Sequence, residues 1–241
     1  MLEIKHVSKK FGSKSALKKA DFEIKKGEVF SLIGPNGSGK TTLVKIIAGL
    51  LQPTQGQVLI NKKDIEKAPK EAKSQIGYIP DEPNVWSKIT AEEFLHFVGA
   101  LFEMPKTERN KAIKKALKIF DLSGLEKEYF EDLSRGNKQK FAILAAFLHN
   151  PKLLLIDEPI VGLDPKSAEI AEKQFAEFAK KGGSVLIVTH TLPVAQKISD
   201  RIGVLCRGEL IEVGTFAELQ KKAKLPKTAS LEEVYKVFTK E

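Results

Sequence analysis

The sequence predicts an α/β protein in which a parallel sheet lies between helices and an all-helical segment is inserted. Apolar runs at 29–33, 152–156 and 184–188 have the length and composition of buried strands. Helical patterns separate these runs, and strands that alternate with helices form parallel sheets. From Ala91 to about Asn150 only helical patterns occur, with apolar residues at three- and four-residue steps. We therefore expect residues 83–150 to form a helical subdomain.

The pattern of residues in the N-terminal part of the chain predicts two strands before the buried strand at 29–33. Residues 2–7 and 20–24 alternate apolar and polar side chains, and Gly12-Ser13 marks a turn between them. Phe11 lies just before this turn, where the spacing fits both an aromatic that stacks on a nucleotide base and an ordinary core residue. Further short strands are predicted at 57–60, 76–79, 202–206 and 209–213.

Residues 34–41, which follow the strand at 29–33 and open a helical run, match the phosphate-binding pattern G-x-x-x-x-G-K-[ST]. Glycines at 34, 37 and 39 let the backbone turn and present N–H groups to phosphate oxygens. The following helix directs its positive end to the same anion. Lys40 adds a charge for the β- and γ-phosphates, and the Thr41 hydroxyl can bind Mg²⁺. A plain Gly-rich turn is the alternative, but every fixed position matches in a strand–loop–helix context.

Two other buried strands end in residues that suit phosphate chemistry. The run at 152–156 leads into Asp157, which suits a Mg²⁺ shell, and Glu158, which can orient or deprotonate an attacking water. A solvated acidic loop is the alternative for this pair. The run at 184–188 leads into Thr189-His190. Ligands bind at the carboxyl ends of strands in such sheets, which favours a functional His190 over a structural one.

A second candidate anion site opens the last helix of the helical segment. Leu133-Ser134-Arg135-Gly136 offers an N-cap serine and a glycine that leaves the first turn open to close approach. The tetrapeptide fits a simple capped helix as well as an anion site. Because it belongs to a different subdomain from Lys40, one nucleotide cannot easily use both within a single compact chain. This arrangement makes a second copy of the chain plausible.

Composition limits the class of protein. The chain has 241 residues, 42% hydrophobic and 29% charged, which allows a sizeable core in one large domain or two small ones. No run reaches about 18 apolar residues and the N-terminus has no signal-peptide core, so we expect a cytoplasmic protein. The lone Cys206 excludes an internal disulfide and a Cys-rich zinc site. A net charge of +9 would suit nucleic acid or an anionic membrane, but the lysines are spread along the chain, which favours a solvated surface.

Taken in order, the motifs resemble those of the ATPase subunit of an ABC transporter over about residues 1–215. They are GPNGSGKTT, IPDEP, LSRGNKQK, LLLIDEP, GLDP and VTH. The resemblance implies a P-loop NTPase core with an antiparallel β subdomain, formed by 1–82 and 151–215, and an inserted helical subdomain at 83–150. The ending SLEEVYKVFTK, in a C-terminal helical extension at 216–241, is similar to that of ABC-2-type and multidrug or antibiotic exporter ATPases.

The resemblance also implies a role for each motif residue. Phe11 would stack on adenine, Glu158 would polarise the attacking water, and His190 would contact that water and the γ-phosphate. Asp164 would bridge two nucleotide sites, and segment 81–90 would face a membrane-spanning partner. The triphosphate of ATP would be cradled by Gly34, Pro35, Asn36, Gly37, Ser38, Gly39, Lys40, Thr41 and Thr42. Mg²⁺ would be held by Thr41, Asp81 and Asp157, and the γ-phosphate of ATP on the partner cassette by Ser134, Gly136 and Asn137.

Three positions depart from the usual motifs of the family. Asp81 stands where the family usually has Gln, which keeps an oxygen for Mg²⁺ but adds a negative charge near the phosphates. Arg135 and Asn137 replace Gly and Gln of the signature LSGGQ, while Ser134 and Gly136 remain. These departures bear on the turnover rate more than on ATP binding.

The resemblance therefore implies a Mg-dependent ATPase that powers transport, with export as the expected direction. Its partners would be ATP, an integral membrane subunit and a second ATPase subunit paired head to tail, and it would lie at the cytoplasmic face of the membrane. No nucleic acid is expected. The alternative is a soluble ABC-type ATPase that remodels a ribosome or a nucleic-acid complex, but such proteins generally carry two cassettes or zinc-binding cysteines. A GTPase would need an N-K-x-D motif, which is missing, and a kinase would not need LSRG.

Overall fold

The computed structural model describes residues 1–240 apart from 84, 86–87, 159 and 161. The described strands are β1 (Leu2–Phe11), β2 (Lys14–Ile24), β3 (Val29–Ile33), β4 (Gln55–Ile60), β5 (Lys63–Asp64), β6 (Ile76–Ile79), β7 (Leu153–Asp157), β8 (Ser184–Thr189), β9 (Arg201–Cys206) and β10 (Glu209–Gly214). The α-helices are α1 (Lys40–Ile47), α2 (Pro69–Lys73), α3 (Ala91–Leu101), α4 (Lys106–Leu117), α5 (Arg135–Phe147), α6 (Pro165–Lys180), α7 (Leu192–Ile198), α8 (Phe216–Lys222) and α9 (Leu231–Thr239).

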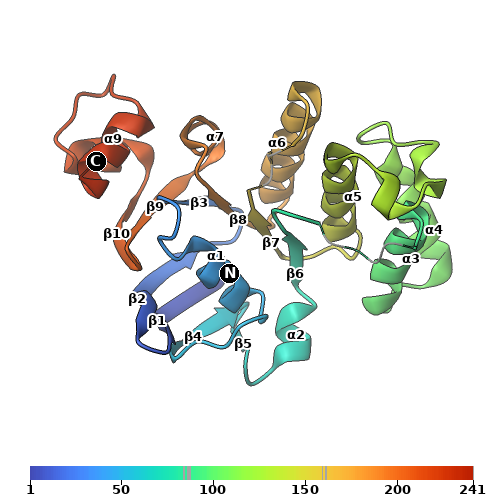
Figure 1. Ribbon diagram of the computed structural model, residues 1–241, viewed down its shortest axis with the longest axis horizontal. Coiled ribbons are helices and arrows are strands. Elements are labelled where there is room, and N and C mark those ends of the chain that lie inside the picture. The colour runs from blue at the N-terminus through green and yellow to red at the C-terminus, as the bar shows by residue number, and fades with distance from the viewer. Residues whose placement is uncertain (84, 86–87, 159, 161, 241) are drawn as a thin grey trace.

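The strands join into one sheet with a parallel half and an antiparallel half, in the order β5-β4-β1-β2-β10-β9-β3-β8-β7-β6 (Figure 1). The neighbours from β9 to β6 run parallel, whereas β1, β2, β4 and β5 pair antiparallel. The halves meet where β10 runs beside β2, with Glu209 opposite Lys19. The predicted fold class, a parallel sheet with an antiparallel β part, is confirmed.

The buried strands of the parallel half are apolar on both faces because helices cover both faces. Successive side chains of a strand point to opposite sides. In β7, Leu153 and Leu155 belong to the core around α1, while Leu154 and Ile156 belong to the core beneath α5 and α6. This two-sided packing fixes the carboxyl ends of β3, β7 and β8 at one edge of the sheet, where the predicted motif residues follow.

Helices α3, α4 and α5 gather on one side of the molecule, within the segment predicted to be helical (Figure 1). Thr90 caps α3 through a capping box with Glu93. Ser134 caps α5, since its hydroxyl oxygen accepts a hydrogen bond from the N–H of Asn137 at 3.3 Å. Further along α5, the Gln139 side chain donates to the Pro80 carbonyl at 3.4 Å. This bond places the first turns of α5 beside the chain that leaves β6.

The C-terminal helices close the other end of the sheet. Leu231 and Val234 of α9 are fully buried in a cluster with Ile202 of β9 and Leu219 of α8. The N–H of Leu231 also donates to the side chain of Gln196 in α7 at 2.8 Å. In the described part of the chain, every helix is too short or too polar to span a lipid bilayer.

Candidate functional site

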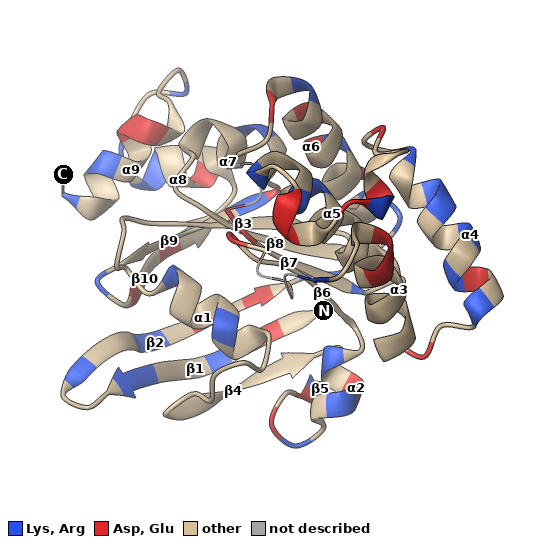
Figure 2. Cartoon of the chain, turned by 45° about the vertical axis from the view of Figure 1, so that its right-hand side comes forward, with Lys and Arg blue, Asp and Glu red and all other residues tan. Residues whose placement is uncertain are grey.

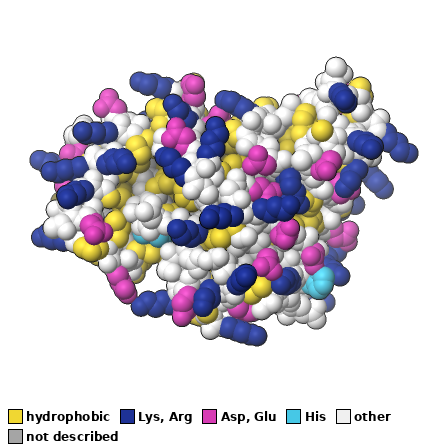
Figure 3. All heavy atoms as spheres, turned by 180° about the vertical axis from the view of Figure 1, so that it is seen from behind, with side chains coloured by type: hydrophobic (Ala, Val, Ile, Leu, Met, Phe, Trp, Pro, Cys, Tyr) yellow, Lys and Arg dark blue, Asp and Glu magenta, His cyan; other side chains and the backbone are white. Residues whose placement is uncertain are grey.

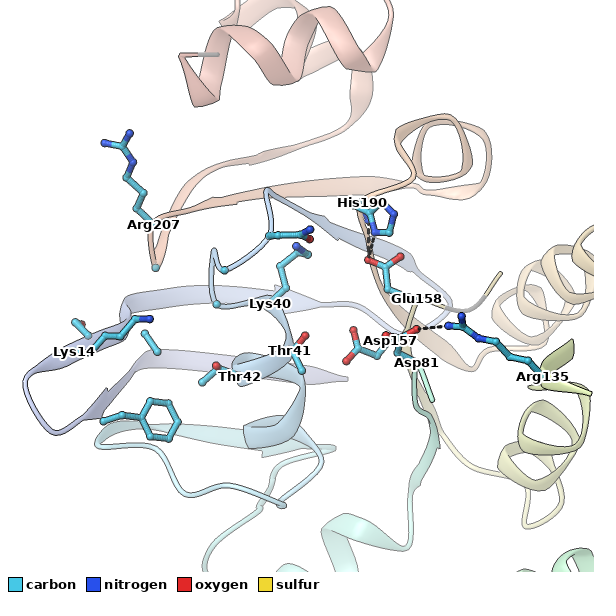
Figure 4. Close-up of a pocket in the computed structure, with 17 residues that line it drawn as sticks. Lys14, Lys40, Thr41, Thr42, Asp81, Arg135, Asp157, Glu158, His190 and Arg207 are labelled. Atoms are coloured by element: carbon cyan, nitrogen blue, oxygen red, sulfur yellow. Dashed lines mark hydrogen bonds and ion pairs between the residues drawn. The ribbon is translucent and has the colours of Figure 1, made fainter. Parts of the chain in front are cut away.

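A cleft of about 870 Å³ opens where β3, β7 and β8 end (Figure 4). Its walls come from the loop after β3, the ends of β7 and β8, and the turns that follow β1 and β9. Eleven of the residues predicted for nucleotide, metal or catalysis line this one cleft: Phe11, Asn36, Gly37, Gly39, Lys40, Thr41, Thr42, Asp81, Asp157, Glu158 and His190.

The loop between β3 and α1 has a shape that only glycine permits at two positions. A Cβ on Gly34 would lie 2.1 Å from the Leu205 carbonyl oxygen, and one on Gly39 would lie 2.5 Å from that of Ala16. Gly39 also has a φ of 107°, which side chains disfavour. Gly37, at φ 77°, has open space around it. The loop is thus held against β9 and β2, and at Gly37 its backbone stays uncovered on the cleft side.

The loop also offers hydrogen-bond donors that suit an anion. The first N–H groups of α1, like those of any helix, lack intrahelical partners, and no side chain within the described residues caps them. The Ser38 hydroxyl is buried and has no partner within the described part of the chain. Lys40 is 6% exposed, and its Nζ donates to the carbonyls of Gly34 at 2.8 Å and Pro35 at 3.1 Å. Burial lowers the pKa of Lys40, against the opposing pull of Glu158 and Asp157. A triphosphate fits this set of donors.

The opposite wall of the cleft is acidic. Glu158 Oε1 accepts the N–H of His190 at 3.0 Å and lies 2.7 Å from His190 Nδ1, while Oε2 accepts the Thr189 hydroxyl at 3.0 Å. Asp157 is 4% exposed. Burial, followed by the charges of Glu158 and Asp81, raises the pKa of Asp157 to about 6. A cation at this wall would relieve the repulsion between these carboxylates.

The residues predicted for Mg²⁺ fit a metal that shares its ligands with a nucleotide. Thr41, Asp81 and Asp157 line the same cleft and supply oxygen, the ligand atom that Mg²⁺ prefers. Nowhere among the described residues do three His, Cys, Asp or Glu side chains gather closely enough to hold a metal by themselves. Phosphate oxygens would have to complete the set, which is the usual way in which proteins bind Mg²⁺ with nucleotides.

The turns after β1 and β9 form the far end of the cleft. Phe11 is 50% exposed, which excludes the interpretation of an ordinary core residue, and Lys9 Nζ lies 5.2 Å from the centre of its ring. Lys14 and Arg207 also line the cleft, and both were missed by sequence reasoning. A basic residue beside each predicted turn was the available signal, but nothing in the sequence brings the two turns together.

Seven predicted residues are not part of the cleft wall as described. Three of them, Gly34, Pro35 and Ser38, belong to the loop after β3, and the other four are Ser134, Gly136, Asn137 and Asp164. Ser134 is exposed. Asp164 caps α6 by accepting the Ser167 N–H at 2.9 Å and the Ser167 hydroxyl at 2.6 Å, and these bonds hold the pKa of Asp164 well below its usual value. The start of α1 therefore lines the cleft, whereas at the start of α5 only Arg135 reaches it. Segment 81–90 is described except for residues 84, 86 and 87.

Comparison with known proteins gives a consistent result. A family model described as ABC transporter matches residues 17–161. The linearmycin resistance ATP-binding protein LnrL of Bacillus subtilis (strain 168) is 34% identical over 91% of this chain and 70% of its own length. The ABC-type transporter ATP-binding protein EcsA of the same organism is 33% identical over 100% of this chain and 97% of its own. The methionine import ATP-binding protein MetN 1 of Bacillus cereus is 36% identical over 91% of this chain and 66% of its own.

Solved structures agree with the sequence relatives. An ATP-binding subunit of an ABC transporter has a TM-score of 0.94 at 32% identity, with 99% of each chain covered. A dimeric, post-hydrolysis ATP-binding cassette bound to ADP and Pi has a TM-score of 0.81 at 31% identity, with 89% of this chain and 98% of the other covered. With this fold and this cleft, the chain belongs to the ABC transporter family, as one of its ATP-binding subunits that hydrolyse ATP to power transport.

Proposed function

We propose that this chain pairs head to tail with a second cassette around two Mg·ATP and that the pair drives export through an integral membrane subunit. One observation carries the pairing. Lys40, Asp157 and Glu158 line the cleft, whereas at the start of α5 the residues Ser134, Gly136 and Asn137 are not part of its wall. A second copy would bring its own Ser134 helix to the open side of the nucleotide, where the positive helix end favours phosphate. The dimeric form of a similar cassette with ADP and Pi supports this arrangement.

Each cleft residue can then be assigned a role in binding or hydrolysing ATP. The buried Lys40 ammonium and the N–H groups of α1 neutralise and orient the triphosphate. Thr41, Asp81 and Asp157 would hold Mg²⁺, which, when bound, neutralises charge on the phosphate oxygens. Glu158 is positioned by His190 and Thr189 to accept a proton from, or to orient, an attacking water. Phe11 presents an exposed ring at the far end for adenine.

An apolar groove beside the cleft suits a membrane subunit. It encloses about 250 Å³ between β6, α3 and α5 and includes Val85, which belongs to the segment predicted to face the membrane partner. Phe102, the C-cap of α3, stacks on His149 in its lining, with ring centroids 3.5 Å apart. We propose that a short cytoplasmic segment of the membrane subunit inserts here and keeps this chain peripheral, at the cytoplasmic face of the membrane.

The basic charge does not favour nucleic acid. Figure 2 shows basic residues interspersed with acidic ones along the chain, and Figure 3 shows the same mixture of side chains on one face, rather than one basic stripe. Lysines of this kind are typical of a solvated surface. We therefore propose no nucleic-acid partner, and a ribosome or nucleic-acid remodelling role is the rival that the experiment must exclude.

Export is proposed because LnrL is named for resistance to a compound, while MetN 1 is named for import, so the direction needs a direct test. The chain should be affinity-purified from its native membrane after mild solubilisation, and co-purifying subunits identified. The complex, reconstituted in vesicles with the cassette outside, should accumulate substrate inside the vesicle only with Mg·ATP. A chain that instead sediments with ribosomes and never with a membrane subunit would contradict the proposal.

A Val98→Glu substitution tests the groove. Val98 is partly exposed and lines it, so a charge there should abolish co-purification of the membrane subunit while ATP binding is retained. Lys111→Glu, on the exposed side of α4, is the control for an added acid on the same helical part. If both variants recover the membrane subunit as the wild type does, the groove is not the docking site.

A further inference from the structure

Two of the departures from the family pattern meet in space. Arg135 Nη2 lies 3.7 Å from Asp81 Oδ1, and both side chains line the cleft (Figure 4). Asp81 follows β6 and Arg135 is the first residue of α5, so the pair joins two segments that are distant in sequence. Asp81, which stands in place of the usual Gln, is thus paired with Arg135, which stands in place of the usual Gly.

The stem of Arg135 is held as well as its charged end. A Cβ added to Gly162 would lie 3.2 Å from Arg135 Cδ and 3.3 Å from Cγ and Nε, so the side chain lies across this glycine. A Cβ on the neighbouring Gly136 would lie 2.7 Å from the Gly162 carbonyl oxygen. The first turn of α5 is therefore packed on the loop after β7, and this contact directs the half-exposed guanidinium toward Asp81.

The charges around this pair show what the guanidinium does there. Asp81, Asp157 and Glu158 all line the cleft, at the end where Mg²⁺ is proposed to bind. Lys40 Nζ is bonded to two backbone carbonyls, and no ion pair joins it to these acids among the described residues. His190 pairs with Glu158, and Asp157 has no ion-pair partner in the described part of the chain. Without Arg135, the charge of Asp81 would add to that of Asp157 at the place where a triphosphate must bind.

We propose that Arg135 is a positioning residue of its own chain's nucleotide site, which neutralises Asp81 and so lets the acidic end of the cleft accept ATP before Mg²⁺ is in place. This inference rests on the proposed ATP site. Mg²⁺, when bound, would itself supply the counter-charge for Asp81, so the arginine would no longer be needed in that role. The pair therefore affects ATP without Mg²⁺ and Mg·ATP differently, which a purely structural contact would not do.

The test is equilibrium binding of ATP by titration calorimetry, once in EDTA and once in Mg²⁺, to the wild-type chain and to Arg135→Gln, Asp81→Asn and the double variant. Arg135→Gln should raise the Kd for ATP in EDTA about fivefold, the upper range for a pair this exposed. It should change the Kd for Mg·ATP less than twofold. In the Asp81→Asn background the same substitution should have little effect in either buffer. Arg135→Lys, which keeps the charge, should retain binding in EDTA.

Lys138→Gln is the matched control. It removes the same charge from the same helix, but Lys138 Nζ donates to the Glu131 carbonyl at 2.8 Å and does not line the cleft. An equal rise in the Kd of Arg135→Gln and Lys138→Gln would show that the effect comes only from the change in net charge, and it would overturn the proposal. So would an Arg135→Gln effect of the same size with and without Mg²⁺, or with and without Asp81. If the wild-type chain binds no ATP at all, the proposed ATP site itself fails instead.

Discussion

Glu158 contacts His190 twice through one carboxylate oxygen, which accepts the backbone N–H of His190 and lies 2.7 Å from its Nδ1. Glu158 itself has a φ of 52°, a conformation that is strained for a side-chain-bearing residue. Its own N–H donates to the Val188 carbonyl at 2.8 Å, and this bond to β8 helps to hold the strained turn. The carboxylate is therefore fixed in place before any water or phosphate arrives, as a general base requires.

Glu158→Gln should lower ATP hydrolysis by roughly a hundredfold or more, because an amide cannot accept the proton of the attacking water. ATP binding should persist, since Lys40 and the N–H groups of α1 are unchanged. The variant should then accumulate as an ATP-bound dimer, visible as a doubling of mass in light scattering after size exclusion.

Glu172→Gln serves as the control for this prediction. Glu172 pairs with Lys197 at 2.6 Å, away from the cleft. The Glu172→Gln protein should hydrolyse ATP at the wild-type rate. A Glu158→Gln chain that binds ATP but stays monomeric at every concentration would refute the composite site.

Gly34→Ala should destabilise the fold and abolish ATP binding. Its Cβ would meet a backbone carbonyl of β9 at 2.1 Å, which no rotation of a side chain can relieve. Gly12→Ala, where φ is 56° and space is open, should cost only about 1 kcal/mol of backbone strain. Urea denaturation of both variants measures the difference. Equal losses in the free energy of unfolding would mean that the loop can move away from β9 without an energetic cost.

The phosphate-binding loop could be predicted from the sequence because its demands are local. Its fixed glycines, Lys40 and Thr41 all lie within residues 34–41, and their order alone predicts where they lie. Arg207 could not be predicted, since the turn after β9 reaches the cleft through tertiary bonds. The Gly208 N–H donates to the Ser38 carbonyl, and the Lys18 N–H to the Gly208 carbonyl, both at 2.9 Å.

The lengths of β1 and β2 show a second limit of prediction from the sequence. The alternating pattern predicts strands at 2–7 and 20–24, whereas β1 runs to Phe11 and β2 begins at Lys14. Half of the added residues are lysines, and shifts in the pairing register, beside His6 with a φ of 52°, interrupt the alternation. Cross-strand pairing extends both strands to the turn, and it is this extension that carries Phe11 and Lys14 to the cleft.

Leu231→Ala should lower the free energy of unfolding by about 2–5 kcal/mol, because a fully buried side chain of α9 leaves a cavity against β9 and α8. Val237→Ala, in the same helix but 47% exposed, should stay within about 0.5 kcal/mol of the wild type. Urea unfolding curves of the two variants provide the measurement. A small effect of Leu231→Ala would show that the C-terminal helices unfold separately from the sheet.

Asp157 should make the nucleotide-free protein less stable as the pH rises. Its pKa in the folded chain is raised from 3.8 to about 6, chiefly by burial, so folding favours the protonated carboxyl. The stability that this carboxyl contributes is complete below about pH 4 and is lost as the pH rises through 6. Asp157→Asn keeps the shape without the charge and should therefore be more stable than the wild type at pH 7.5 but not at pH 4.

The expected gain at pH 7.5 is on the order of 1–2 kcal/mol, since one pKa unit corresponds to about 1.4 kcal/mol and solvent in the open cleft screens the charges around the carboxylate. Urea unfolding of both proteins at the two pH values measures it, with the exposed Asp132→Asn as a control that should show no such trend. Mg·ATP should reverse the order of stability at pH 7.5, because the metal favours the charged carboxylate that Asn cannot supply. A gain that is the same at both pH values would contradict the assignment of the charge to Asp157.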